Sequence, residues 1–378
     1  MKHRFVVFVA AAFAAPLPAL AQDHVHVEEL GAVSFPVSCS AEAQEFMHRA
    51  VAMLHSFWFP EALRTFEDAA TADAGCGIAH WGAALSHFGN PMAGGSGAEG
   101  QAAGWASAQR AVSAGARSAR DQAYVDAAVA LFRDHERADN RTRMRAYATA
   151  MRSIVDRHPE DTEATIFHAI FMVANASPTD LTFAQQRRAA EVLNELYAQH
   201  PTHPGLAHYI IHAFDSPPLA QYALAAARQY ADIAPAAPHA LHMPSHTFTR
   251  LGYWDESIAT NRRSADLEPT PGGKSHPLDY LVYGYLQQGR DPMALQAIQE
   301  IGGNTQGEYI AGTLGSYNAL AMPARYALER DDWASAAALR VVSTAPSAEA
   351  VTRFARGLGA ARLGQVAAAQ EEVAALEG

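Results

Sequence analysis

The 378-residue sequence has only two cysteines, and it has fewer basic side chains (28 Lys and Arg) than acidic ones (39 Asp and Glu). Two cysteines are too few for a Cys-rich zinc module. A formal net charge of −11 argues against nucleic acid or an anionic membrane surface as the main partner. Histidine, by contrast, occurs 18 times. A metal held by this chain must therefore be held mainly by imidazole.

Several motifs with a defined chemistry are also missing. Residues 90–104 are glycine-rich but lack the Gly-Lys-Ser/Thr ending of a phosphate-binding loop, so we expect a loop there, either plain or acting as a lid. The chain has no Gly-x-Ser-x-Gly nucleophile motif and no His-Glu-x-x-His of the zinc-protease type. The sequence therefore does not favour a hydrolase.

The N-terminus has the pattern of a secretory signal peptide. Lys2 and Arg4 precede an apolar run at 5–15, and Ala-Leu-Ala follows and ends at Ala21. The run is too short for a permanent membrane-spanning helix, and no later run reaches the ~18 apolar residues that such a helix needs. We expect cleavage after Ala21 and a mature protein that is periplasmic or secreted, without membrane association.

An exported protein folds under oxidising conditions, which favour a disulfide between Cys39 and Cys76. The alternative is a pair of buried thiols. After the signal peptide at 1–21, we expect a lead segment at 22–42 and a single helical-repeat domain at 43–378.

The rest of the sequence predicts helices almost throughout. Stretches rich in Ala, Leu, Arg and Glu, with apolar residues at helical spacing, occupy residues 42–55, 106–112, 120–132, 141–157 and 220–233. No run of alternating β-branched residues indicates a strand. The predicted fold class is therefore all-α, and the alanine content suits helices that pack closely.

The prolines indicate a repeat. Pro201, Pro235 and Pro269 each follow a predicted helix and stand 34 residues apart. This is the period of the tetratricopeptide (TPR) repeat, a pair of antiparallel helices that closes with a proline. We therefore predict a TPR-like solenoid whose helix pairs stack into a right-handed superhelix.

The histidines follow the same period. One row of residues at 34-residue spacing is His208, His242 and His276, and a second row is His212, His246 and Tyr280. Residues four apart lie on one helix face with their Cβ atoms ~5–6 Å apart, so each pair can converge on one cation. Neighbouring helix axes lie ~8–10 Å apart, a gap that side chains from two rows can close around one metal or two.

Two further residues share these faces. His239 joins His242 and His246 in one column, and Asp215 joins His208 and His212 in the next. Asp215 is a candidate either to orient a histidine or to bind metal, and Tyr280 is a candidate to contact a substrate. His203 could cap a helix or approach the site from its rim.

The sequence resembles a group of bacterial and fungal TPR-domain proteins. The resemblance rests on HYIIHAFD at 208–215, HALHMPSH at 239–246 and RLGYW at 250–254, together with LHSFW at 54–58, and runs from about Cys39 to Leu286. It implies a TPR-like fold in which both histidine rows face one concave groove, but it implies no settled reaction. His55 belongs to the motif at 54–58 and would face the same cavity if the superhelix curls far enough.

The donor set narrows the choice of metal. Imidazole without thiolate suits Zn(II), Cu(II), Ni(II) and Fe(II). Paired His-x-x-x-His helices with additional histidines resemble the ligand pattern of coupled dicopper proteins, so we place copper ahead of zinc.

Two hypotheses follow. The first is an exported metalloprotein, either an oxidoreductase acting on a small or peptide substrate in the groove or a metal carrier. The second is a TPR module that binds a peptide and uses the histidines for packing. The sequence does not decide between an enzyme and a carrier.

Overall fold

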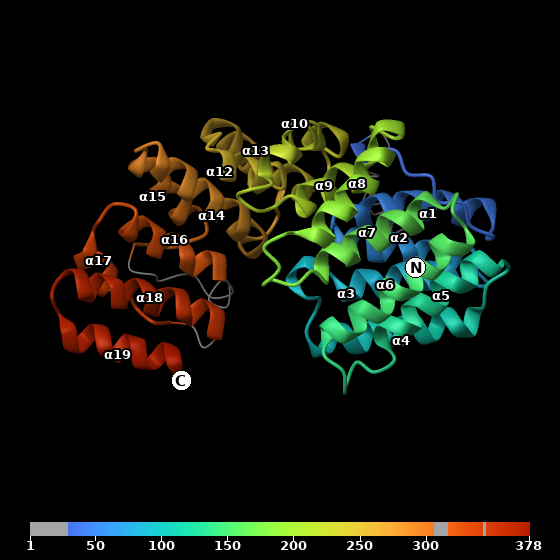
Figure 1. The fold of residues 1–378 in the computed structure, drawn as a ribbon, viewed down its shortest axis with the longest axis horizontal. Helices are drawn as coiled ribbons and strands as arrows, with labels where there is room; N and C mark the ends of the chain where they lie inside the picture. Colours follow the sequence, from blue (N-terminus) through green and yellow to red (C-terminus); the bar gives the residue numbers. More distant parts are fainter. Residues whose placement is uncertain (1–28, 306–316, 343–344) are drawn as a thin grey trace, which may run out of the picture.

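A computed structural model of the protein describes residues 29–305, 317–342 and 345–378. The expected signal peptide and its cleavage site lie outside these ranges. The described part of the chain consists of helices and connecting turns, with no strand. The all-α prediction is confirmed (Figure 1).

The helices form successive antiparallel pairs. The first helices of the pairs are α1 (Ala41–His55), α3 (Gly77–Phe88), α5 (Ala119–Phe132), α7 (Thr162–Ala174), α9 (Pro204–Ala213), α11 (Pro238–His242) with α12 (Pro244–Leu251), α14 (Pro271–Gln287), α16 (Tyr317–Leu328) and α18 (Pro346–Arg362). The second helices are α2 (Phe59–Ala72), α4 (Ala98–Ala114), α6 (Asn140–Arg157), α8 (Ala184–Gln199), α10 (Leu224–Ile233), α13 (Trp254–Leu267), α15 (Asp291–Glu300), α17 (Trp333–Ala337) and α19 (Val366–Glu377). Short 3₁₀ turns occur at η2 (Pro91–Ala93) and η3 (Ala220–Ala223).

The 34-residue period is visible in the helix ends. Helices α8, α10 and α13 end at Gln199, Ile233 and Leu267. A proline stands two residues after each of these ends, where it cannot continue the helix. The chain is therefore a TPR-like helical-repeat solenoid, as its sequence predicts.

One helix is longer than the sequence suggests. Helix α4 begins at Ala98, so residues 98–104 are helical and the glycine-rich connection is limited to 89–97. Gly104 lies within this helix, and the position requires glycine because a Cβ there would meet the Phe132 ring. The glycine here allows two helices to approach closely, and it does not mark a loop.

The solenoid curls enough to bring its first repeat against a later one. Helix α1 contacts α9, about 150 residues further along the chain. The lead segment reinforces this contact, because the Ala32 N–H donates to the Thr202 carbonyl (3.0 Å) and the Ala236 N–H donates to the Glu29 carbonyl (3.2 Å). Phe35 of the same segment is fully buried and stacks on Trp81 at 5.4 Å between ring centroids.

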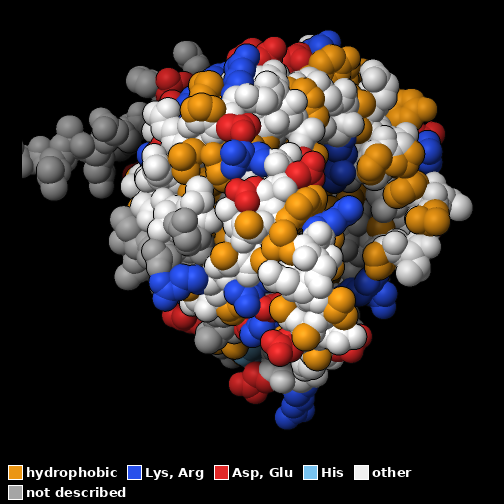
Figure 2. Space-filling view, turned by 90° about the vertical axis from the view of Figure 1, so that its left-hand side faces the viewer, with side chains coloured by type: hydrophobic (Ala, Val, Ile, Leu, Met, Phe, Trp, Pro, Cys, Tyr) orange, Lys and Arg blue, Asp and Glu red, His pale blue; other side chains and the backbone are white. Residues whose placement is uncertain are grey.

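The surface at the C-terminal end mixes charges of both signs. Figure 2 views the molecule from the left-hand side of Figure 1, and Lys and Arg side chains lie there among Asp, Glu and scattered hydrophobic ones. Among the residues with described positions, no helix combines the length and the apolarity needed to cross a bilayer.

Cys39 and Cys76 form a disulfide, with an S–S distance of 1.98 Å and Cα atoms 5.3 Å apart. Cys39 lies just before α1 and Cys76 caps α3, so the bond joins the starts of the first two helix pairs. The alternative of two buried thiols is therefore wrong.

Removing this disulfide should destabilise the fold. The bond spans 37 residues of sequence, and a loop of this size constrains the unfolded chain by about 4 kcal/mol. We expect Cys39→Ser with Cys76→Ser to lower the free energy of unfolding by about 3–4 kcal/mol in urea titrations. Thiol titration of the unreduced, unfolded protein should find no free thiol, and two free thiols would contradict the assignment.

Candidate metal centre

Six of the predicted histidines converge in the structure. We call His208, His212 and His239 triad A, and His242, His246 and His276 triad B. Within each triad, one ring nitrogen from every histidine lies within 4.8 Å of those of the other two. Triad A combines α9 with α11, and triad B combines α11, α12 and α14, all of them first helices of their pairs.

A break in one helix separates the two triads. Pro244 begins α12 and interrupts the helix after His242, so that α11 is only one turn long. His239, on α11, lies beside α9, and its Nε2 is 3.2 Å from Nε2 of His208. The sequence groups His239 with His242 and His246, whereas the structure places it with the α9 pair.

The hydrogen bonds of triad A fix one of its tautomers. Nδ1 of His208 donates to the main-chain carbonyl of His55 at 2.6 Å, so its Nε2 carries a lone pair and faces His239. Nε2 of His212 is buried and has no hydrogen-bond partner. Triad A therefore contains one acceptor nitrogen that faces His239 and one buried ring nitrogen without a partner.

Triad B is more constrained. Nδ1 of His242 donates to Oδ1 of Asn261 at 2.7 Å, and Nδ2 of Asn261 donates to the Ser257 carbonyl, which fixes the orientation of the amide. Nδ1 of His246 donates to Oδ2 of Asp215 at 2.9 Å. In the neutral protein both Nε2 atoms then carry lone pairs, and they face one another at 3.0 Å.

The third histidine of triad B also presents a free nitrogen. Nδ1 of His276 is buried without a partner, and the side chain has a hydrogen bond with Asn318. The two triads are neighbours, since the ring centroids of His239 and His242 are 5.9 Å apart and those of His212 and His246 are 6.3 Å apart.

Burial keeps most of these imidazoles neutral. Desolvation, followed by the repulsion of neighbouring imidazolium charge, holds the pKa of His208, His239 and His242 well below the ordinary value. The same causes lower the pKa of His212 to about 3 and that of His276 to about 4. At neutral pH each of these five imidazoles is therefore uncharged and carries one lone pair.

Asp215 supplies negative charge to triad B. While Oδ2 of Asp215 accepts from His246, Oδ1 accepts from Nε of Arg250 at 2.5 Å. Burial alone would raise the pKa of Asp215, but His246 and Arg250 outweigh it and hold the carboxyl ionised. The hydroxyl oxygen of Tyr280 is 3.4 Å from Nε2 of His246, and burial raises the pKa of this phenol. Asp215 thus orients a histidine, and Tyr280 borders the nitrogen that would hold a metal.

His55 and His203 lie apart from the triads. Nε2 of His55 and Nε2 of His203 donate to the two oxygens of Glu163, at 2.7 and 2.8 Å. Burial would raise the pKa of Glu163, but the two histidines overcome it and hold the pKa well below its usual range. His55, Glu163 and His203 thus form a third buried group whose ligand atoms lie within 4.8 Å of one another, and the His55 carbonyl also positions His208.

A polar pocket opens beside triad B. It has a volume of about 150 Å³ and is lined by His246, Arg250, Tyr280, Tyr283 and Arg325, among others. Arg325 is anchored by the buried carboxylate of Asp279 through a hydrogen bond of 2.7 Å from Nε. A small molecule in this pocket would lie against a histidine of triad B.

Sequence reasoning identified all six triad histidines and the positions of Asp215 and Tyr280. It missed Asn261 and Glu163, which lie on α13 and α7. Neither residue keeps the 34-residue register, and a single Asn or Glu on a helix carries no signal of its own. Asn261 reaches His242 from the second helix of the same pair, and Glu163 reaches His55 and His203 across different pairs.

No protein-family model and no curated protein matches the chain. Among solved structures, it is similar to a chain of the APC/C hetero-tetramer Cut9-Hcn1, at 14% identity and a TM-score of 0.41, over 88% of this chain and 66% of that one. The chain thus covers just under two thirds of that protein. It is also similar to the TPR domain of P58(IPK), at 12% identity and a TM-score of 0.24, over 86% of this chain and 99% of that one. Both similarities concern the fold alone.

The lowered histidine pKa values predict a loss of stability in acid. Because the unfolded histidines protonate near pH 6.5 and the folded ones do not, the stabilisation is present above pH 6.5 and is lost as the pH falls towards the folded values, about 3 for His212 and about 4 for His276. Each such histidine should contribute about 1.4 kcal/mol per pH unit to the slope. Urea titrations of the metal-free protein from pH 7.5 to 5 measure this slope.

His212→Gln and His276→Gln serve as matched variants for the pH titration. Each should reduce the slope of stability against pH by about one proton. An unchanged free energy of unfolding between pH 7 and 5 would contradict the buried, neutral state of the triads.

Proposed function

We propose that the chain is an exported TPR-like metalloprotein that holds two metal ions, one in each triad, with copper ahead of zinc. The observation that carries this proposal is the pair of Nε2 atoms of His242 and His246, which face one another at 3.0 Å while both Nδ1 atoms donate outward. Two lone pairs at this separation repel each other unless a cation or a proton lies between them.

A metal ion fits this position better than a proton. His276 adds a third imidazole, one ring nitrogen of which lies within 4.8 Å of those of His242 and His246, and a single proton cannot bridge three nitrogens. Two nitrogens bound at roughly 2.0–2.1 Å to one ion lie about 3.0–3.3 Å apart at angles of about 95–105°. The separations of 3.0 Å in triad B and 3.2 Å in triad A agree with this geometry.

The charge balance favours copper. Triad A consists of three neutral imidazoles, and among the described residues Asp215 acts on its His212 only through space, without a hydrogen bond. A buried ion there is compensated less than in triad B, and the desolvation cost is smaller for Cu(I) than for a divalent ion. Three imidazoles suit both copper and zinc, so charge is the property that separates the two metals.

The open side of triad B supports an enzyme over a carrier. Three protein ligands leave a coordination position free, as in catalytic rather than structural metal sites. The adjoining pocket of about 150 Å³ suits a small molecule better than a peptide. Bound copper would supply one-electron redox chemistry, and Arg250, Arg325 and Tyr280 would bind and orient the substrate. The competing hypotheses are a metal carrier and a TPR peptide-binding module without metal.

Three features of the chain support export and the resemblance to the bacterial and fungal TPR-domain group. The N-terminal 21 residues have the composition of a signal peptide. The Cys39–Cys76 disulfide suits an oxidising compartment such as the periplasm or the cell exterior. The two motifs that carry the resemblance, at 208–215 and 239–246, contribute five of the six triad histidines.

Metal analysis of the untagged protein tests the proposal. We expect two copper ions per chain after loading, as measured by elemental analysis following dialysis. His208→Ala with His212→Ala should leave one ion, in triad B. His242→Ala with His246→Ala should leave one ion, in triad A.

His200→Ala, at an exposed position outside both triads, is the control and should keep two ions. Circular dichroism verifies that each variant is folded. A folded protein without stoichiometric metal would favour the peptide-binding module, and metal content that is unchanged in both double variants would exclude the triads as the site.

Asp215→Asn tests whether the negative charge of Asp215 strengthens metal binding in triad B. The amide oxygen can still accept from Nδ1 of His246, but the negative charge is lost, and removal of such a partner typically weakens metal binding 10–100-fold. Competition with a chelator should show this loss for one of the two ions only. Arg250→Gln, which leaves the Asp215 charge in place, should bind metal at least as tightly as the unaltered protein. Equal weakening in both variants would argue for a general structural effect.

A further inference from the structure

We propose that the apolar cavity beside triad A is a dioxygen site and that the Phe57 ring is the gate between this cavity and the metal. The proposal rests on the proposed function, since it concerns how an oxidant reaches copper in triad A. It goes beyond that function because it assigns a second binding site, on the side of the centre away from the polar pocket.

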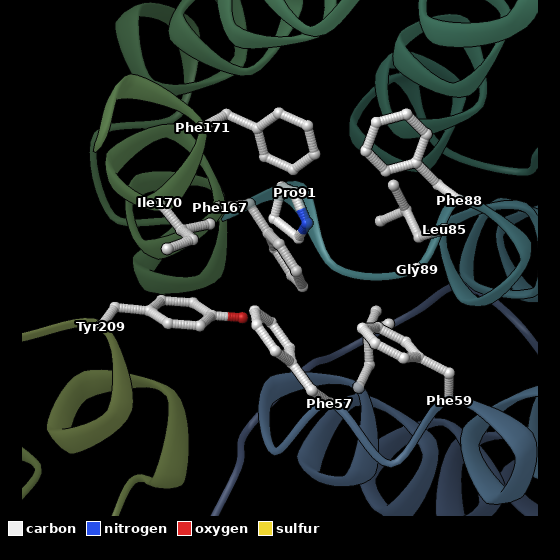
Figure 3. Close-up of a pocket in the computed structure, with 11 residues that line it drawn as sticks. Phe57, Phe59, Leu85, Phe88, Gly89, Pro91, Phe167, Ile170, Phe171 and Tyr209 are labelled. Atoms are coloured by element: carbon white, nitrogen blue, oxygen red, sulfur yellow. The ribbon is translucent and has the colours of Figure 1, made fainter. Parts of the chain in front are cut away.

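The cavity is enclosed almost entirely by hydrocarbon. It lies between α1, α3, α7 and α9 and has a volume of about 20 Å³. Figure 3 shows the rings of Phe57, Phe59, Phe88, Phe167 and Phe171 around it, with the Tyr209 hydroxyl directed towards Phe57. A space of this size holds one or two atoms, which suits a diatomic molecule and excludes an organic substrate.

Water is a poor occupant of this cavity. The only polar side-chain atom in the lining is the Tyr209 hydroxyl. It donates to Nδ1 of His55 at 3.0 Å, since Nε2 of His55 is the donor to Glu163. A buried water needs two to four polar partners, and this site offers at most one acceptor. An apolar molecule needs no hydrogen-bond partner and can therefore occupy the same cavity.

Phe57 connects the cavity to the metal site. Its ring lines the cavity and also contacts each histidine of triad A. The centroid of the Phe57 ring is 4.4 Å from that of His208, 5.2 Å from that of His239 and 5.7 Å from that of His212. The ring of Phe57 is therefore the barrier between the cavity and the nitrogens of triad A.

The backbone of Phe57 adopts a conformation that is unfavourable for a bulky residue, so the surrounding structure must hold it in place. Phe57 has a φ of 52°, in the left-handed region that costs a bulky residue roughly 1–3 kcal/mol. Residues 56–58 join α1 to α2, and the Phe57 N–H donates to the Leu54 carbonyl at 3.1 Å. Such strained positions cluster at ligand sites, where the surrounding structure holds them.

The opposite end of the cavity lies at the glycine-rich connection. Gly89, which follows α3, lines the cavity and has a φ of 74°. A Cβ built at Gly89 would meet no atom within 4 Å, so open space adjoins this residue. Small apolar molecules can enter here, and Phe57 is the last side chain before triad A.

Xenon reports on the cavity whether or not metal is bound. We expect the metal-free protein under xenon pressure to take up one xenon atom in contact with Phe57 and Leu85, seen by ¹²⁹Xe NMR or in crystals. Leu85→Phe, which fills the cavity, should abolish this site. Leu196→Phe, a matched substitution on α8 away from the cavity, should retain it.

The second measurement follows dioxygen to the metal. Two Cu(I) ions lose one electron each, and dioxygen accepts both electrons and two protons from the buffer to give hydrogen peroxide and two Cu(II) ions. Stopped-flow oxidation of the Cu(I)-loaded protein should be at least 10-fold slower in Leu85→Phe and unchanged in Leu196→Phe. Phe57→Gly should react several-fold faster, because glycine adopts the same φ without strain and removes the ring.

The outcomes separate this inference from the proposed function. Copper content is measured for every variant, so loss of metal is not mistaken for loss of access. A protein that binds two copper ions but takes up no xenon, or whose Leu85→Phe variant oxidises at the normal rate, overturns the dioxygen site and leaves the metal centre intact. A protein that binds no copper overturns the proposed function, and xenon uptake still decides whether the cavity accepts an apolar guest.

Discussion

The opposition of imidazole lone pairs is the constraint on which the rest of the site depends. His242 and His246 each use Nδ1 as a donor to a fixed acceptor, so when both rings are neutral their Nε2 atoms face one another as two acceptors. A hydrophobic core would not tolerate such an arrangement, since buried polar atoms normally have a partner. The same condition applies to the unpartnered nitrogens of His212 and His276. One cation in each triad would satisfy all of these atoms, as the proposed metal centre requires.

The repeat architecture explains how so many histidines reach one place. A 34-residue period returns the chain to the same face of the next first helix, so a pair at i and i+4 is repeated at the spacing of neighbouring helices. The curl of the solenoid then adds what the period alone does not supply. It brings the end of α1 against α9, where the His55 carbonyl fixes the tautomer of His208 and the Phe57 ring covers triad A.

The difference between the repeat period and the contacts made by the curl also explains which features could be predicted from the sequence. The fold class, the helix ends and the two histidine rows depend on local periodicity, which the sequence displays directly. The grouping of His239 with His208 depends on how closely α11 lies beside α9, which residue spacing alone does not give. Asn261 depends on the contact between the two helices of one pair, and Glu163 and the placement of Phe57 depend on helices that are distant in the chain. Such contacts leave no periodic trace in a single sequence.

The two triads differ in their surroundings, and this difference bears on the chemistry of the centre. In triad B, ionised Asp215 accepts from His246, which makes that imidazole a stronger donor and balances the charge of a divalent ion. Triad A is covered by the Phe57 ring, and among the described residues Asp215 acts on its His212 only through space, without a hydrogen bond. A low-dielectric site with the weaker counter-charge favours the lower oxidation state of a bound metal. With copper in both triads, as proposed, the ion in triad A would be the more strongly oxidising of the two in its Cu(II) form, and the ion in triad B the more easily oxidised. Such a centre would take an electron from a substrate in the polar pocket at one end and exclude water from the other.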